Sequence, residues 1–168
     1  MINITDKKYK NIVKPILRDN NFKKTYYIEH HGISRMDHSL KVSYYSYKIA
    51  KKLGLNYEVV ARAGLLHDFY LDGDERNTFQ KFKDTFNHPK KALLTTNKYF
   101  KLNDMEQNII VSHMFPLYYK LPKYRESFLV NIVDKFIGCH EMLKSLRCHI
   151  SYRFNYLFII AIIFLYNN

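Results

Sequence analysis

The chain has 168 residues, 47% of them hydrophobic, with 15 Tyr and 12 Phe but only 5 Gly and 4 Pro. This length and apolar content suit one folded domain with a real core and exclude a disordered chain. The net charge of +12 suggests an anionic partner, but the basic residues are scattered in pairs, which does not indicate a dedicated nucleic-acid surface.

The two cysteines, Cys139 and Cys148, do not form a CxxC pair, which argues against a disulfide framework or a thiolate zinc site. The N-terminus, MINITDKKYK, has no apolar signal core, so we expect a cytoplasmic protein. Codons rich in A and T encode Lys, Asn, Ile, Tyr and Phe, all of which are frequent in this chain. The base composition of the gene would therefore by itself raise the positive charge. The charge therefore permits a phosphate-containing small molecule as substrate without demonstrating one.

Apolar residues recur at helical spacing through most of the chain, which predicts an all-α bundle of about six helices with short connections. We expect a first helical stretch over about residues 8–28, interrupted near Pro15, and Gly32 marks a stop. A second helix follows, with Ser34 as its N-cap and Gly54 as its end.

The third predicted helix starts at Asn56 and ends in a polar loop over residues 70–84. The fourth is expected to begin near Pro89, because proline suits a first helical turn, and to reach about Phe100.

A capping-box pair, Asn103 and Glu106, predicts the start of a fifth helix that runs to Pro116. A sixth helix should follow Pro122. Its expected buried face carries Phe128, Val133, Phe136 and Ile137.

The composition changes near Ile150, and residues 156–166 (YLFIIAIIFLY) are apolar on all sides. Eleven helical residues span only about 16 Å, against roughly 30 Å of bilayer hydrocarbon, which disfavours a membrane span. A buried final helix or strand, or a tail that docks to a partner or a membrane, fits this segment better. We expect one helical domain over 1–149, with its core at about 30–146, and an apolar tail over 150–168.

Histidine and aspartate recur at the ends of the predicted helices, flanked by apolar residues, and such positions can converge inside a bundle. An ionised carboxylate in an apolar core is costly unless it is paired or bound to a metal. Each residue alone also fits a hydrogen-bonded core position, and His88 could be a helix N-cap. The joint pattern favours a metal site. Its residues are His38, the adjacent pair His67 and Asp68, His88, His113 and Asp134.

Three segments, MDHSLKVSYYSYKIAKKLG, ARAGLLHDFYLDG and NIVDKFIGCHEML, resemble the HD superfamily of metal-dependent phosphohydrolases. The signature of that family is a His, then an adjacent His-Asp pair, then a distant Asp, on successive helices of one bundle. His38, His67, Asp68 and Asp134 match these four positions in order. The resemblance implies an HD-type helical fold over about residues 30–146.

Some HD proteins carry two further histidines between the His-Asp pair and the last Asp, and His88 and His113 occupy those places. The full order resembles the HD hydrolases that split diadenosine tetraphosphate symmetrically. It is also similar to the cyclic-di-GMP phosphodiesterases, but their Gly-Tyr-Pro signature is absent. The Glu-Asp pair that marks guanosine-tetraphosphate hydrolases is not evident either.

The resemblance implies one or two divalent transition-metal ions, of Mn, Fe, Zn, Co or Ni, with Mg less suited to such ligands. In the two-ion form Asp68 bridges the ions, and a metal-activated hydroxide attacks a phosphomonoester or phosphoanhydride of a nucleotide-like substrate. With one ion, His88 and His113 instead donate hydrogen bonds to the phosphate or leaving group. The implied ligands are His38, His67 and Asp134 for one ion, and His88 and His113 for the other.

Basic residues near these ligands are candidates to hold substrate phosphates, although each also fits a solvated surface charge. An alternative to catalysis is a metal-binding HD regulatory or interaction module without turnover, which would dock through the apolar tail. The complete ligand set favours hydrolysis, with Asp68, His88 and His113 as the catalytic candidates. The candidate phosphate-binding residues are Arg35, Lys90, Lys91 and Lys135.

Overall fold

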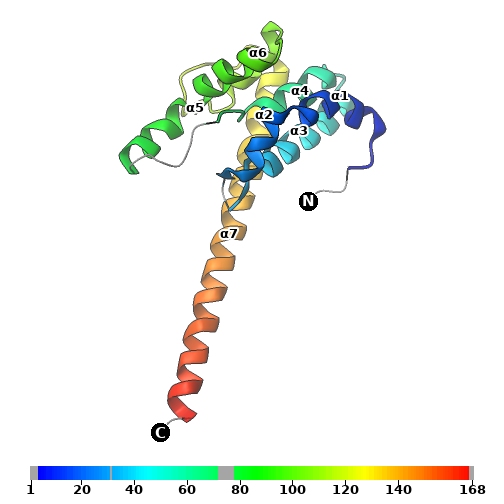
Figure 1. Cartoon of the computed structure of the whole chain (residues 1–168). Helices are drawn as coiled ribbons and strands as arrows, with labels where there is room; N and C mark the ends of the chain where they lie inside the picture. The colour runs from blue at the N-terminus through cyan, green and yellow to red at the C-terminus, as the bar shows by residue number, and fades with distance from the viewer. Residues whose placement is uncertain (1–3, 31, 72–77, 167–168) are drawn as a thin grey trace.

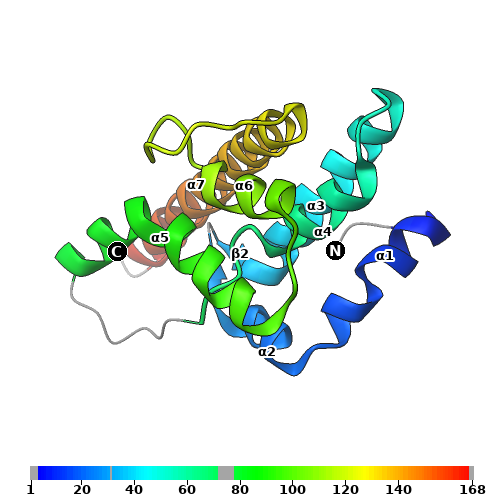
Figure 2. The same ribbon diagram turned by 90° about the horizontal axis from the view of Figure 1, so that it is seen from above.

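The computed structural model describes residues 4–30, 32–71 and 78–166, with side chains given for all of these except 30, 78–86 and 148–166. In the described part, seven α-helices form a compact body from which the last helix projects (Figures 1 and 2), so the predicted all-α fold is confirmed. The elements are α1 (Lys7–Arg18), α2 (Asn20–Lys23), the 3₁₀ turn η1 (Lys24–Tyr27), β1 (Glu29–His30), β2 (Ile33–Ser34), α3 (Arg35–Lys52), α4 (Tyr57–Leu66), α5 (Thr78–Tyr99), α6 (Asp104–Ser112) and α7 (Arg125–Tyr166).

The first helix, α1, continues through Pro15, so the predicted interruption there is wrong. Tyr9 and Ile16 are fully buried, and this packing outweighs the one backbone hydrogen bond that proline removes. The helix ends at Arg18. The next residue, Asp19, starts α2 by accepting hydrogen bonds from two backbone amides of that helix.

A short antiparallel hairpin of β1 and β2 separates η1 from α3, and it was not predicted. Gly32 lies in its turn with φ of 82°, a left-handed conformation that side chains rarely adopt. The predicted stop at Gly32 is therefore a hairpin turn. Ser34 caps α3 as predicted, by accepting a hydrogen bond from the amide of Asp37.

Helices α3 and α4 approach each other closely at Gly64 and Ser43. A Cβ atom built on Gly64 would lie 3.1 Å from the Cα atom of Ser43, tighter than ordinary contact. The Ser43 hydroxyl also donates to the carbonyl of Ala61 at 2.6 Å. This contact sets the position of the end of α4, where His67 and Asp68 follow.

We expect Gly64→Ala to lower the free energy of unfolding by about 1–3 kcal/mol, because the added methyl group must push two helix backbones apart. Chemical denaturation of the metal-free protein measures the effect. An unchanged denaturation midpoint would show that the two helices separate without cost.

Helix α5 begins at Thr78, so the start predicted near Pro89 is wrong, and Pro89 lies inside the helix. The predicted loop over 70–84 is also wrong from residue 78 onward, while residues 72–77 lie outside the described part. The helical spacing of Phe79, Phe82 and Phe86 in the sequence is the signal that the polar composition obscured.

Helix α6 has the predicted capping box. The Asn103 side chain accepts from the amide of Glu106, and the Glu106 carboxylate accepts from the amide of Asn103. The helix ends at Ser112 rather than at Pro116. His113 is therefore the residue at which the chain leaves the helix.

Helix α7 has 42 residues and continues without a break across the change of composition near Ile150. Residues 150–166 are thus an extension of the helix that bears Asp134. Within the residues described, no helix combines the length and the apolar character needed to cross a membrane.

The buried face of α7 is largely polar, so the burial predicted for Phe128 and Phe136 is wrong. These two side chains are 46% and 74% exposed, whereas Val133 is buried as predicted and Ile137 is half-buried. The side chains that α7 turns inward are Ser127, Val130, Asn131, Asp134 and Glu141.

Candidate metal centre

Two of the histidines are held by the same kind of side-chain-to-backbone hydrogen bond, each at the end of a helix. His67 follows the last residue of α4 and His113 follows the last residue of α6. Each Nδ1–H donates to the carbonyl three residues earlier, at 2.8 Å to Gly64 and 2.7 Å to Ile110. This bond fixes the tautomer, so the lone pair on each Nε2 points away from its helix.

The Nε2 atom of His67 faces two carboxylates. It lies 3.4 Å from Oδ1 of Asp134 and 3.8 Å from Oδ2 of Asp68. The atom is buried and makes no hydrogen bond within the described part of the chain. A lone pair directed at two carboxylates indicates a place for a cation.

His38, on α3, lies between two carboxylates of α7. Its Nε2 is 3.0 Å from Oδ1 of Asp134, and its Nδ1 donates to Oε2 of Glu141 at 2.7 Å. Burial opposes the charged imidazole, but the hydrogen bonds to Asp134 and Glu141 outweigh it and raise the pKa of His38 to about 10. Burial also opposes ionisation of Asp134, yet its interactions with His38 and His67 hold its pKa well below the usual range.

A second group of ligand atoms surrounds the other oxygen of Asp68. Oδ1 of Asp68 lies 3.3 Å from Nε2 of His88 and 3.5 Å from Nε2 of His113. The two histidine nitrogens are 2.8 Å apart. Burial lowers the pKa of His113 despite the nearby Asp68, which keeps this imidazole neutral. Asp68 therefore has one oxygen toward each group.

These contacts bring all six predicted metal ligands into one buried cluster. They form three overlapping sets whose ligand atoms lie within 4.8 Å of one another. Imidazole nitrogens and carboxylate oxygens suit Mn, Fe, Zn, Co or Ni. The buried lone pair of His67 and the low pKa of Asp134 both fit a bound cation. The sets are His38, His67 and Asp68; His67, His113 and Asp134; and Asp68, His88 and His113.

The four candidate phosphate-binding residues lie in different surroundings. Arg35 is buried; its guanidinium donates to the Tyr70 carbonyl at 2.7 Å and lies over the Tyr70 ring. Lys135 donates to the His113 carbonyl at 3.2 Å, and burial lowers its pKa although Asp134 opposes this. Lys90 is exposed and Lys91 half-buried. Their binding of substrate stays a prediction.

Two polar residues of α7 that support the cluster were not predicted. Glu141 is buried and holds both His38 and Lys41, each at 2.7 Å. The Asn131 amide donates to three carbonyls at the end of α6, that of His113 among them at 2.6 Å. Their spacing from Asp134, seven residues after and three before, places all three on one helix face and is the signal in the sequence.

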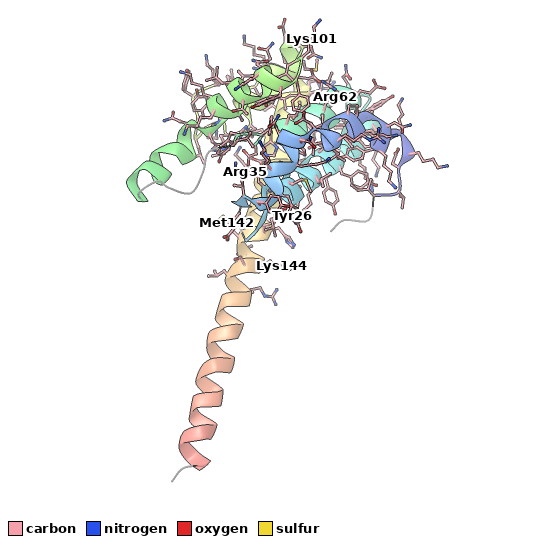
Figure 3. All side chains as sticks on the ribbon, in the orientation of Figure 1. Tyr26, Arg35, Arg62, Lys101, Met142 and Lys144 are labelled. Carbon is pink, nitrogen blue, oxygen red and sulfur yellow. The ribbon has the colours of Figure 1, made fainter. Side chains whose placement is uncertain are left out.

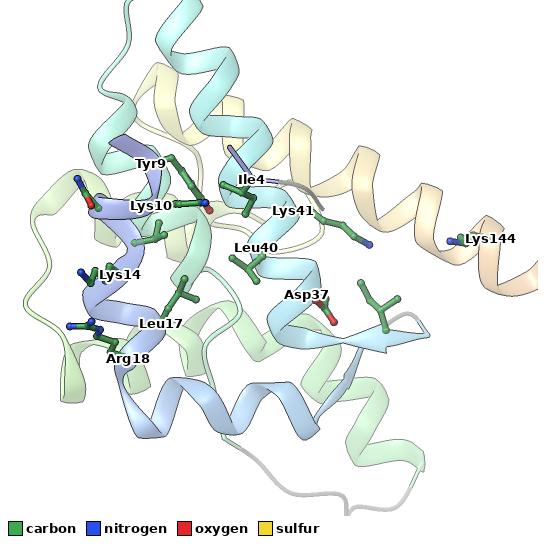
Figure 4. A pocket seen from close by; sticks show the side chains of 13 residues that line it. Ile4, Tyr9, Lys10, Lys14, Leu17, Arg18, Asp37, Leu40, Lys41 and Lys144 are labelled. Atoms are coloured by element: carbon green, nitrogen blue, oxygen red, sulfur yellow. The ribbon is translucent and has the colours of Figure 1, made fainter. Parts of the chain in front are cut away.

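Two clefts border α3 in the described part of the chain. One, of about 700 Å³ between α1 and α3, has an apolar floor and a basic rim that includes Lys10, Lys14 and Arg18 (Figure 4). None of the six ligands is among the residues described as lining it. His88 and Asp134 are the least buried of the six, with 7% and 9% of their surface exposed.

A family model described as HD domain matches residues 35–138, well over half of the chain. The chain belongs to the HD domain family. The matched range of this HD domain protein contains all six clustered residues but ends before Glu141. No curated protein and no solved structure matches the chain significantly.

The HD protein in its metal-free form should lose stability as the pH rises from about 6.5 to 10. The pKa of His38 is raised, so its contribution is fully present below its ordinary value and is lost as pH approaches about 10. For the loss of one proton, the free energy of unfolding falls by at most about 1.4 kcal/mol per pH unit. Denaturation of chelator-treated protein across this range measures it. His38→Gln should flatten the profile, and an already flat profile in the unmodified chain would contradict the expectation.

Proposed function

We propose that this HD protein is a metal-dependent phosphohydrolase acting on a phosphomonoester or phosphoanhydride of a nucleotide-like small molecule. The observation that supports it best is the position of Asp68, whose two oxygens face two different groups of histidines. Such an arrangement suits a pair of ions that share one carboxylate, as in two-metal phosphoester hydrolases.

In this proposal, Asp68 belongs to both ion sites. Divalent ions bound there supply Lewis acidity, which neutralises phosphate charge and acidifies water. Glu141 fixes the ring of His38, and the helix-end carbonyls fix His67 and His113, so the ligand atoms are already oriented. The remaining ligands are His38, His67 and Asp134 for one ion, and His88 and His113 for the other.

Burial of the cluster strengthens its electrostatic action on a phosphate, because few water molecules screen it. His88 and Asp134 mark the least buried side of the cluster, and Lys135 is the cation nearest Asp134 in sequence on the same helix. We place the substrate phosphate on this side. If only one ion binds, His88 instead serves as a hydrogen-bond donor to the phosphate or the leaving group.

We expect the purified protein to contain transition metal and to release phosphate or nucleotide from at least one member of a substrate panel. The panel should include nucleoside monophosphates, diadenosine polyphosphates and cyclic dinucleotides, each tested with Mn, Fe, Zn, Co, Ni and Mg. Chelation should abolish turnover and re-addition of metal should restore it. Metal-replete protein that is inert toward the whole panel would favour the regulatory module instead.

A further inference from the structure

The outer face of α7, opposite the face that bears Asp134 and Glu141, is apolar and exposed. Ile132, Phe136 and Leu143 are 50%, 74% and 56% exposed, and Leu146 is 57% exposed. Met142 and Lys144 mark the level at which α7 leaves the helical body (Figure 3). An apolar stripe of this length on one helix indicates a surface that another element covers.

The stripe has the spacing of a coiled coil. Alternating steps of three and four residues lead from Leu129 to Leu146, and the sequence continues this spacing to Phe164, with Arg153 as the one departure among eleven positions. Five heptads of such spacing favour pairing with a second helix. The helix is 42 residues long, or about 63 Å, and only its first part packs on its own domain. The eleven positions are Leu129, Ile132, Phe136, Cys139, Leu143, Leu146, Ile150, Arg153, Leu157, Ile160 and Phe164.

A groove of about 1150 Å³ between α3 and α7 borders this stripe. Ile132 and Phe136 belong to both, and Tyr45 and Ile49 of α3, each over a third exposed, form the opposite wall. A helix on the stripe would therefore also contact α3. Stable interfaces bury about 800 Å² per partner, and both the stripe and the α3 wall contribute exposed apolar side chains toward that area.

We propose that the occupant is a second copy of this chain, whose α7 packs parallel and in register against the α7 of the first. An identical helix matches the heptad period along its full length, and the same residues then serve both partners in a closed pair. By the heptad numbering, Arg153 is the one charged core residue and faces its counterpart in this pair. An antiparallel pair about the middle of α7 would instead set the two Cys139 residues apart along the helix, so cross-linking through Cys139 distinguishes the two arrangements.

The two cysteines provide a matched test. Cys139 is exposed and occupies a core position of the heptad, so in a parallel pair it lies next to Cys139 of the other copy. Cys148 falls at an outer position in the heptad numbering, away from the pairing face. We expect Cys148→Ser protein to form disulfide-linked dimers with diamide. Cys139→Ser protein, treated identically, should stay unlinked. Light scattering should give twice the chain mass for the unmodified protein.

Leu143→Glu places a charge in the pairing face and should give the mass of one chain, and it should also abolish the Cys139 cross-link. Leu94→Glu, at a 63% exposed position on α5, is the control and should remain a dimer. Leu143 and Leu94 are both exposed, so circular dichroism and metal content should not change in either variant. The dimer proposal can therefore fail while the proposed hydrolysis stands, and the reverse. A single-chain mass for the unmodified protein, or no preference for Cys139 over Cys148, would overturn the proposal.

Discussion

Replacing Asp68 by Asn is expected to remove bound metal and to lower turnover by roughly 10³-fold or more, beyond the 10–100-fold typical of residues that only support a ligand. Asn keeps the size of the side chain but removes the negative charge that both histidine groups face. Without that charge, two nearby cations would repel each other with less compensation. Metal content by mass spectrometry and initial rates on the best substrate measure both effects.

Asp104→Asn is a suitable control for this change. Asp104 is an exposed carboxylate in the first turn of α6, outside the cluster, so the same chemical substitution there should leave metal content and rate unchanged. Circular dichroism of both variants separates loss of the site from loss of the fold. Full metal content in Asp68→Asn would refute the shared role of this carboxylate.

The second large effect is expected at Glu141. We expect Glu141→Gln to weaken metal affinity by about 10–100-fold, because the carboxylate that orients His38 and increases its basicity is lost. Turnover at saturating metal should fall much less than the affinity, because Glu141 contacts a ligand rather than the substrate. Competition with a coloured chelator measures the affinity.

Glu106→Gln provides the matched comparison for Glu141. Both carboxylates are buried and paired with a cation, and Glu106 accepts from Arg62 at 2.6 Å on another side of the molecule. Glu106→Gln should lower stability through its lost ion pair, while metal affinity stays unchanged. Equal metal affinity in the two variants would mean that Glu141 has only a structural role.

The sequence predicted the cluster well because its residues follow local rules. His67 and His113 end apolar helical stretches, and Asp134 follows an apolar pair, so the pattern of helix ends indicates convergence. Glu141 could not be found this way. A glutamate in a helix is ordinarily on the surface, and only the packing of α3 against α7 makes this one buried.

Errors in the fold have two physical causes. Pro15 and Pro89 both lie inside helices, because a proline does not end a helix that packing elsewhere supports. On α7, hydrophobic periodicity predicts an apolar buried face. The inward face instead meets the polar cluster through Asn131 and Asp134, which leaves the apolar side chains outside.

The bonds from His67 and His113 to their own helix-end carbonyls also determine how the centre responds to losing its ions. Both rings are locked by hydrogen bonds that need no metal, so their rotamers are already selected. Ordering a free side chain costs up to about 2 kcal/mol of conformational entropy, and these two ligands avoid that cost on binding. Metal should therefore exchange in and out of a rigid frame, with little accompanying change in backbone mobility around α4 and α6.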